Sequence, residues 1–212
     1  MTMNATYNPK IFDVEDLEAA QDIILTPEVG LTTADRWEAE TPYLLSLMKD
    51  FNLNKDSLVV DYGCGIGRLS KEIIAQNDCH VVGVDISMNM RSLSHIYVNS
   101  DKFAPISKDF LPLLQDSVDA VLAVWVLQHT FNLDEEISNI KKILKPGGKL
   151  FVVNEKLRCI PTDKGWMNDG KDIFISLQSN FKTEVIDNLD ASVVSDQVSR
   201  RTFYGMFTKV EQ

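Results

Sequence analysis

One stretch decides the fold class of this 212-residue chain: Val59-Val60-Asp61-Tyr62-Gly63-Cys64-Gly65-Ile66-Gly67-Arg68. It continues a short β-rich run that begins at Leu58, and its glycines let the backbone turn sharply and approach another group closely. Residues 68–76 then show the apolar periodicity of a helix. A strand, a glycine-rich turn and a helix in succession form the first unit of an α/β sheet.

Outward from this stretch, short apolar runs alternate with helical patterns. The expected strands besides 58–61 are 80–85, 103–107, 118–124, 149–154, 184–189 and 201–209, and the expected helices are 87–98, 134–144 and 171–180. Most of the runs are continuously apolar, which indicates strands buried on both faces. With helices between them they predict a parallel, doubly wound α/β sheet, in which ligands bind at the carboxyl ends of the strands.

The first 55 residues read as helical. Helices are expected over 13–25 and 33–40, and a third is expected to run to about Phe51 because Thr41-Pro42 looks like an N-cap followed by a proline at the first helical position. No internal repeat or low-complexity linker follows. We therefore expect a helical cap, residues 1–55, and an α/β domain, residues 56–212, in a single structural unit.

Composition narrows the functional classes. The formal net charge of −10 disfavours a nucleic-acid partner, because an acidic surface repels phosphates. The three cysteines, Cys64, Cys79 and Cys159, form no Cys-x-x-Cys pair, so neither a disulfide framework nor a metal site is expected and a cytoplasmic setting fits best. The polar start and the lack of any apolar window of about 18 residues argue against a signal peptide and a membrane span.

The glycine loop has an acidic partner. Asp85 ends the next strand, 24 residues after Asp61, where a carboxylate can accept hydrogen bonds from both hydroxyls of a ribose. A dinucleotide site is the competing interpretation, but its G-x-G-x-x-G spacing is absent, since Gly67 follows Gly65 after only two positions. Asp61 would also repel a pyrophosphate, whereas a ligand with an ammonium or sulfonium group would be compatible with it.

Five motifs in order resemble the class I (Rossmann-like) S-adenosylmethionine-dependent methyltransferases. They lie at 59–70, 81–87, 108–110, 118–129 and 144–150. The resemblance implies a mostly parallel seven-stranded sheet with an antiparallel last strand and an N-terminal helical lid. It also implies S-adenosylmethionine as cofactor and S-adenosylhomocysteine as product. Because the chain is compact and acidic and shows no appended recognition domain, we expect a small-molecule methyl acceptor.

The resemblance also assigns roles along the donor. The loop after the first strand would hold its methionine part, Asp85 the ribose, and Asp109 the adenine amine. The residues carried over to the donor site are Asp61, Gly63, Cys64, Gly65, Gly67, Asp85, Ile86, Met88, Asp109, Phe110 and Ala123. Arg36 and Trp37 are expected in the lid, and Trp125 is either a wall of the methyl-donor pocket or part of the core.

His129 is the candidate catalytic residue, because an imidazole near neutrality can accept a proton from a hydroxyl or amine. Local packing of His129 is the alternative. Glu155, Tyr7 and Tyr204 are also expected near the acceptor. Since the donor is already activated, the protein needs alignment rather than a nucleophile or a metal, and a base only for an acceptor that must lose a proton early.

Two other functions stay open from the sequence. One is a donor-binding or regulatory protein of the same fold without catalysis. The other is aminopropyl transfer from the decarboxylated donor, which calls for a paired acidic pocket that Trp125-Val126-Leu127-Gln128 does not offer. The oligomeric state and the acceptor atom are not determined by these patterns.

Overall fold

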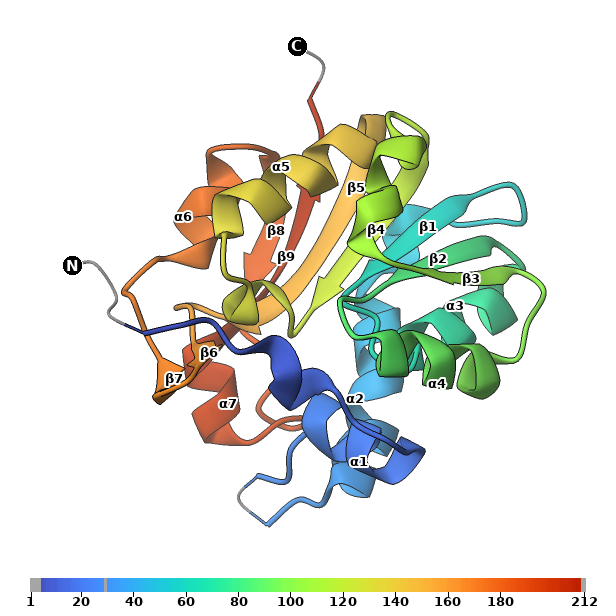
Figure 1. Cartoon of the computed structure of the whole chain (residues 1–212). Helices are drawn as coiled ribbons and strands as arrows, with labels where there is room; N and C mark the ends of the chain where they lie inside the picture. Colours follow the sequence, from blue (N-terminus) through green and yellow to red (C-terminus); the bar gives the residue numbers. More distant parts are fainter. Residues whose placement is uncertain (1–4, 29, 211–212) are drawn as a thin grey trace.

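A seven-stranded sheet with strand order β3-β2-β1-β4-β5-β9-β8 forms the centre of the molecule (Figure 1). The computed structural model describes residues 5–28 and 30–210, so positions 1–4, 29 and 211–212 of the two expected domains lie outside the described residues. The strands are β1 (Leu58–Tyr62), β2 (His80–Val84), β3 (Phe103–Ile106), β4 (Val118–Val124), β5 (Leu144–Glu155), β6 (Ile160–Thr162), β7 (Gly165–Met167), β8 (Lys182–Asp187) and β9 (Thr202–Thr208).

The sheet topology confirms the predicted fold class. Strands β1 to β5 pair in parallel, whereas β9 is antiparallel to both β5 and β8. The chain order reverses at β1, which lies between β2 and β4. At such a switch point the loops after adjacent strands diverge and leave room for a ligand. The predicted glycine loop leaves β1 at this point.

Helices cover both faces of the sheet. The helices are α1 (Leu17–Ile24), α2 (Thr33–Leu47), α3 (Arg68–Asn77), α4 (Met88–Val98), α5 (Leu133–Ile143), α6 (Ile173–Gln178) and α7 (Asp196–Arg201), and the 3-10 turns are η1 (Pro9–Phe12), η2 (Lys49–Phe51), η3 (Lys108–Leu114) and η4 (Leu127–His129). Apolar side chains of α5 and α6 form one core with the sheet, and those of α2, α3 and α7 form a second core. Within 5–28 and 30–210, no helix has the length and apolar character to cross a membrane.

The predicted helix break at Thr41 is wrong, because α2 continues through Pro42. Proline removes one backbone hydrogen bond and costs about 3 kcal/mol in a helix interior. Leu44 and Leu45 lie in the core beyond it, and burying each stabilises the fold by about 1.5–3 kcal/mol. Glu38, whose carbonyl loses its partner, lies on the exposed side of the helix. The packing of Leu44 and Leu45 therefore outweighs the Thr41-Pro42 pattern, which by itself predicts the start of a new helix.

Several other boundaries differ from the predictions. α1 begins four residues later than expected, because the Asp16 side chain accepts a hydrogen bond from the Ala19 N–H at 2.8 Å and caps the helix there. The β6–β7 hairpin and α7 were not predicted. Strands of three residues and a helix of six are too short to show a periodicity.

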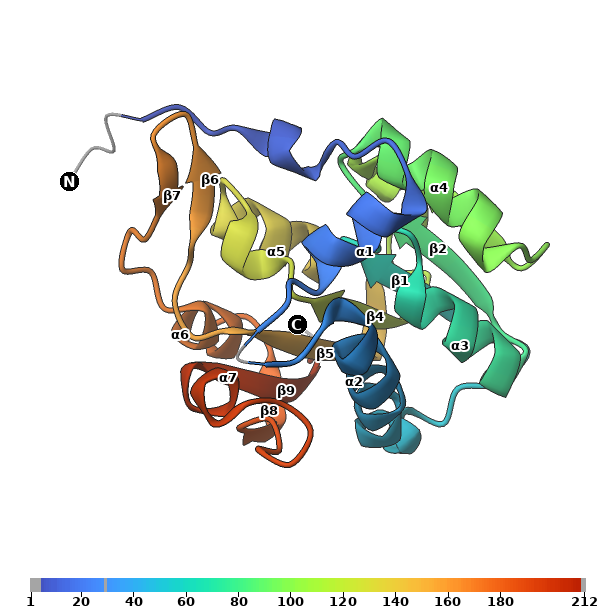
Figure 2. The ribbon, with the colours of Figure 1, turned by 90° about the horizontal axis from the view of Figure 1, so that it is seen from below.

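Two parts of the expected helical lid are α1 and the segment before it, residues 5–12, which includes η1 and is called the strap below. Figure 2 shows the strap running from the β6–β7 hairpin toward α4. Three hydrogen bonds fix it to the hairpin: Asn8 N to Pro161 O at 3.0 Å, Asp163 N to Thr6 O at 2.9 Å, and Thr6 N to the Asp163 side chain at 2.9 Å. α2, in contrast, mainly belongs to the helical layer beside α3.

Candidate functional site

A cavity of about 590 Å³ lies at the carboxyl ends of β1, β2 and β4. The strap and the end of α1 contribute to its lining, and so does the β6–β7 hairpin through Trp166. Predicted site residues that line it are Arg36, Gly63, Gly65, Asp85, Ile86, Trp125 and His129. Predicted site residues outside the lining are Trp37, Asp61, Cys64, Gly67, Met88, Asp109, Phe110 and Ala123.

The glycine loop is tied to the end of β2. The N–H groups of Gly63 and Cys64 both donate to the carbonyl of Val84, at 2.7 and 3.0 Å. Gly63 has a φ of +77°, and a Cβ atom there would lie 2.3 Å from Cγ2 of Val126. Glycine is therefore required at this position both by the left-handed backbone and by the close approach of Val126.

Asp85 joins the glycine loop to the start of α4. Its Oδ2 accepts a hydrogen bond from the Gly65 N–H and its Oδ1 accepts one from the Ser87 N–H, both at 2.9 Å. Burial raises the pKa of this carboxyl, and the two N–H donors oppose that rise. A carboxylate has about four acceptor positions. Two of them are used by the protein, so the side chain can still accept from a ligand in the cavity that it lines.

Asp61 points away from the cavity. It is 4% exposed, and its carboxylate accepts a hydrogen bond from the Ser70 hydroxyl at 2.7 Å. Burial raises its pKa to about 6, although Ser70 and the charge of Arg68 lower it. The contact joins the end of β1 to the first turns of α3. Asp61 therefore stabilises the glycine loop from the side of α3, away from the cavity.

We predict that Asp61→Asn removes part of the pH dependence of folding stability. The folded protein holds the Asp61 proton up to about pH 6, whereas the unfolded chain releases it near the ordinary value of 3.8. The wild-type free energy of unfolding should therefore decrease as the pH rises from about 4 to 6, by about 3 kcal/mol from this group. Urea titrations of both proteins between pH 4 and 7 measure this difference. Parallel stability curves for the two proteins would contradict the prediction.

The other predicted donor contacts lie at the periphery. Asp109 is exposed and accepts a hydrogen bond from the Ser107 hydroxyl at 2.8 Å, while Phe110 and Met88 are 54% and 69% exposed. The Ala123 carbonyl already accepts from the Asn154 amide at 3.4 Å. These roles therefore stay predictions.

Trp125 is both a wall of the cavity and a part of the core. Its φ of +58° is unusual for a bulky residue and stores backbone strain at the end of β4. The backbone N–H of Trp125 donates to the carbonyl of Val153 at 2.7 Å. Its indole Nε1 is buried without an acceptor among the described residues. The strained turn directs residues 126–129 across the end of the sheet.

A chain of hydrogen bonds determines the protonation of His129. The Glu155 N–H donates to Oε1 of Gln128 at 2.6 Å, so the Gln128 amide nitrogen is the group that faces His129 Nε2 at 3.0 Å. The amide donates, and Nε2 must accept. Nδ1 therefore carries the proton and donates to the Cys159 carbonyl at 2.7 Å. Burial lowers the pKa of His129, which agrees with a neutral ring.

His129 also belongs to an aromatic wall. Its ring lies 5.0 Å from that of Trp166 and 5.9 Å from that of Phe12, and all three residues line the cavity. Trp166 and Phe12 come from the hairpin and the strap. The strap also places Tyr7 in the lining, as expected, whereas Tyr204 packs in the second core.

Charged groups complete the lining, and of these the sequence indicated only Glu155. Arg201 contacts Glu155 at 3.2 Å and also pairs with Glu28 of the α1–α2 loop. Lys108 contacts Glu136 at 3.3 Å, and Glu136 also accepts from the Tyr62 hydroxyl. The charged groups other than Glu155 are far apart in the sequence, and no local pattern marks them. Residues 5–28 and 30–210 contain no group of three or more His, Cys, Asp or Glu side chains suited to a metal.

Comparison with known proteins agrees with the motifs. Residues 60–152 match the family model of a methyltransferase domain. A sterol 24-C-methyltransferase from Gibberella zeae is 36% identical over 105 residues, which make up 47% of this chain and 27% of that protein. An uncharacterized methyltransferase-like protein from Schizosaccharomyces pombe is 31% identical over 142 residues, 66% of this chain and 49% of that protein. The chain thus spans less than half the length of these relatives.

Solved structures show the same fold. Phosphoethanolamine N-methyltransferase 2 from Haemonchus contortus, in complex with S-adenosylmethionine, superimposes with a TM-score of 0.64 at 16% identity, over 80% of this chain and 53% of that one. At this identity the likeness concerns the fold alone. The match over residues 60–152 identifies a methyltransferase domain in this chain, and the sheet topology is that of the class I S-adenosylmethionine-dependent methyltransferases.

Proposed function

We propose that this chain transfers a methyl group from S-adenosylmethionine to a small-molecule acceptor by in-line displacement. The observation that carries the proposal is Asp85, a half-buried carboxylate on the cavity wall that two N–H groups of the protein fix between the glycine loop and α4, with acceptor positions left for a ligand. A ribose is a ligand with two adjacent donors for it. The cavity volume of about 590 Å³ is in the range of small-molecule sites.

The residues of the chain would act by alignment and by exclusion of water. When bound, S-adenosylmethionine supplies a methyl group activated by a sulfonium. The glycine loop and Asp85 would orient the donor, and Phe12, His129 and Trp166 would form a wall for the acceptor. Well-oriented reactants gain about 7–11 kcal/mol over free ones. An apolar surrounding also favours a step in which positive charge is lost.

The covered cavity supports a small acceptor rather than a macromolecule. The strap and hairpin close over its aromatic wall, and the carboxylates Glu28, Glu136 and Glu155 are all paired with cations. Paired carboxylates also disfavour the aminopropyl-transfer alternative, which needs free acids for a polyamine. A cytoplasmic protein without a nucleic-acid partner fits the free thiols and the net charge of −10, and belongs to the same proposal.

Calorimetry with S-adenosylhomocysteine tests the donor part of the proposal. We expect saturable binding at micromolar concentrations, and no binding at high micromolar concentration would contradict it. A screen for transfer of a labelled methyl group to phenols, amines and thiols distinguishes a catalytic protein from one that only binds the donor. Transfer to any of them above the rate without protein supports catalysis, whereas donor binding without transfer supports the alternative.

We predict that His129→Ala leaves donor binding within about threefold of the wild type. Both imidazole nitrogens are engaged by Gln128 and by the Cys159 carbonyl, so neither is available to the donor. Proton resonances of the ring should titrate below pH 6.5, because burial lowers the pKa of His129. A ring that titrates above pH 6.5 would contradict the assigned hydrogen-bond chain and restore His129 as a candidate base.

A further inference from the structure

The carboxylates that line the cavity differ in how the protein uses their oxygens. Among the described residues they are Glu28, Asp85, Glu136 and Glu155. Asp85 and Glu136 each accept two hydrogen bonds from the protein. Glu28 accepts one from Arg201. The Glu155 carboxylate accepts none from any group in the described part of the chain, so its acceptor positions are open to a ligand.

Arg201 neutralises only part of the charge beside it. Its Nη2 donates to Glu28, whereas its Nε lies 3.2 Å from Oε1 of Glu155 in an ion pair that lacks the alignment of a hydrogen bond. One positive and two negative side chains leave this group with a net charge of −1. Hydrogen-bond donors and positive charge are attracted to such a group. It therefore favours a ligand that brings N–H donors to Glu155.

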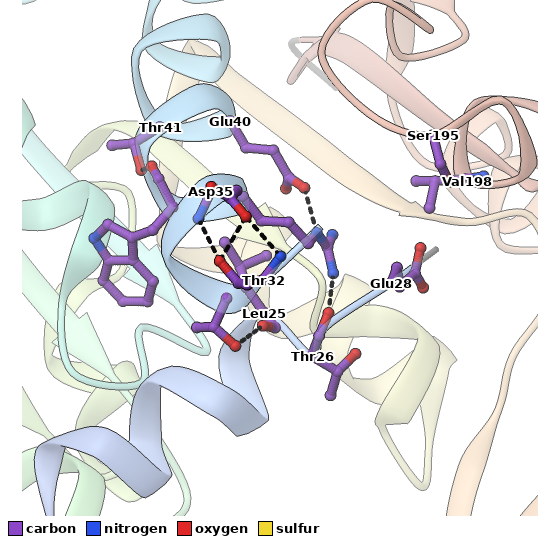
Figure 3. A network of polar contacts seen from close by, with 12 residues as sticks. Leu25, Thr26, Glu28, Thr32, Asp35, Glu40, Thr41, Ser195 and Val198 are labelled. Carbon is purple, nitrogen blue, oxygen red and sulfur yellow. Dashed lines mark hydrogen bonds and ion pairs between the residues drawn. The ribbon is translucent and has the colours of Figure 1, made fainter. Parts of the chain in front are cut away.

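The loop between α1 and α2 explains why Arg201 donates to Glu28. Nη1 of Arg36 holds this loop by donating to the carbonyl of Thr26 at 2.7 Å (Figure 3). The backbones of Glu28 and Leu31 also exchange two hydrogen bonds, at 3.1 and 2.8 Å. Because Glu28 is fixed in this way, Arg201 donates to the loop rather than to the carboxylate at the end of β5.

Glu155 lies on the acceptor side of the cavity. It ends β5, whereas Asp85 follows β2, and these strands are three strand spacings apart in the sheet, about 14 Å. The Glu155 N–H donates to Gln128 at 2.6 Å, and the Gln128 amide contacts the His129 ring. Burial and the charge of Glu155 both raise the pKa of the Cys159 thiol. Glu155 therefore borders the aromatic wall rather than the expected ribose site.

The aromatic wall of Phe12, His129 and Trp166 suits a flat ring. The ring of Phe12 lies 6.5 Å from that of Trp166, and Trp166 is 49% exposed, which leaves aromatic surface for a ligand to pack on. Both nitrogens of the His129 ring are engaged, by Gln128 and by the Cys159 carbonyl, so this ring is not free to act as a base. The wall therefore favours an acceptor with a planar ring and a nucleophilic atom that carries its own lone pair.

We propose that the methyl acceptor is an aromatic amine and that the Glu155 carboxylate binds its amino group. This inference rests on the proposed function. The two N–H groups would donate to the carboxylate while the nitrogen lone pair attacks the methyl carbon. The new C–N bond forms as the C–S bond breaks, the bonding pair stays on sulfur, and the extra proton on nitrogen then leaves to water. An aromatic amine is neutral at neutral pH and needs no base, whereas a phenol must lose its proton.

The test uses three compounds that share one ring system: naphthylamine, naphthol and unsubstituted naphthalene. Calorimetry on the wild-type protein saturated with S-adenosylhomocysteine should show that naphthylamine binds about 10-fold or more tightly than naphthalene. With S-adenosylmethionine, kcat/KM for naphthylamine should exceed that for naphthol by about 100-fold, because no base assists the phenol. Glu155→Gln keeps the shape of the side chain but removes its charge, so the binding preference should fall to about threefold or less.

Glu28→Gln is the matched control, because it removes the charge of the other carboxylate on Arg201. It should keep the binding preference for naphthylamine within about threefold of the wild type. S-adenosylhomocysteine affinity and thermal unfolding of Glu155→Gln show whether the variant is folded and whether the donor uses this carboxylate.

Three results would overturn the inference: no preference for naphthylamine over naphthalene, equal losses in the two variants, or faster transfer to naphthol than to naphthylamine. A folded Glu155→Gln protein with weakened S-adenosylhomocysteine binding would also overturn it, by assigning Glu155 to the donor. Absence of S-adenosylhomocysteine binding to the wild type would instead contradict the proposed function.

Discussion

Replacing Asp85 by alanine should weaken S-adenosylhomocysteine binding by about 100-fold or more. A carboxylate that accepts from two ribose hydroxyls makes two charge-assisted hydrogen bonds, each worth about 1.5–3 kcal/mol. The protein already holds the side chain in place with the Gly65 and Ser87 N–H groups, so the ligand does not have to order it. Calorimetry on both proteins at pH 8 measures the loss directly.

Two controls accompany Asp85→Ala. Asp85→Asn keeps one oxygen that can accept from one of the two N–H donors, so the fold should remain largely stable. Its affinity for S-adenosylhomocysteine should still fall, because the amide cannot accept hydrogen bonds from both ribose hydroxyls. The second control is pH. Burial raises the pKa of Asp85, so wild-type affinity should fall on acidification at a pH above the ordinary range of an aspartate. A folded Asp85→Ala protein with wild-type affinity would show that the ribose assignment is wrong.

Gly63→Ala should destabilise the fold by about 3–5 kcal/mol. The left-handed φ of +77° costs an L-residue about 1–2 kcal/mol, and the new Cβ atom would lie 2.3 Å from Cγ2 and 2.6 Å from Cβ of Val126. Neither atom can swing away, because Val126 is β-branched and stiff. Overpacking of this kind costs about 1–3 kcal/mol or more. Urea unfolding measures the change in free energy.

Gly147 is a matched control for the backbone contribution. It has the same φ of +77°, but a Cβ atom built there meets nothing within 4 Å. Gly147→Ala should therefore show only the conformational cost, about 1–2 kcal/mol. The difference between the two variants isolates the clash with Val126. Equal destabilisation by both substitutions would show that Val126 moves aside without cost.

The strands and the glycine loop could be predicted because their signals are local. Continuous apolar runs and a glycine cluster are readable from neighbouring residues, and they placed Gly63, Gly65 and Asp85 on one cavity. The orientation of the Asp61 side chain, in contrast, could not be predicted from the motif. Strand side chains alternate between the two faces. Tyr62 faces α5, so Asp61 faces α3 and meets Ser70, which a motif comparison does not show.

The parts that the sequence did not predict depend on distant partners. α2 crosses Pro42 because Leu44 and Leu45 are buried by other elements. The strap finds its place through residues 161–163, more than 150 positions away. Arg201 reaches the cavity only because β9 runs antiparallel to β5. Local propensity depends only on neighbouring residues, so it cannot predict any of these contacts.

The pairing of the strap with the β6–β7 hairpin has a consequence for how the protein is made. On the ribosome the strap emerges before its partners at 161–163, which are synthesised only after β1, β2 and β4. The three strands whose ends border the cavity are therefore synthesised before the strap can pair with the hairpin.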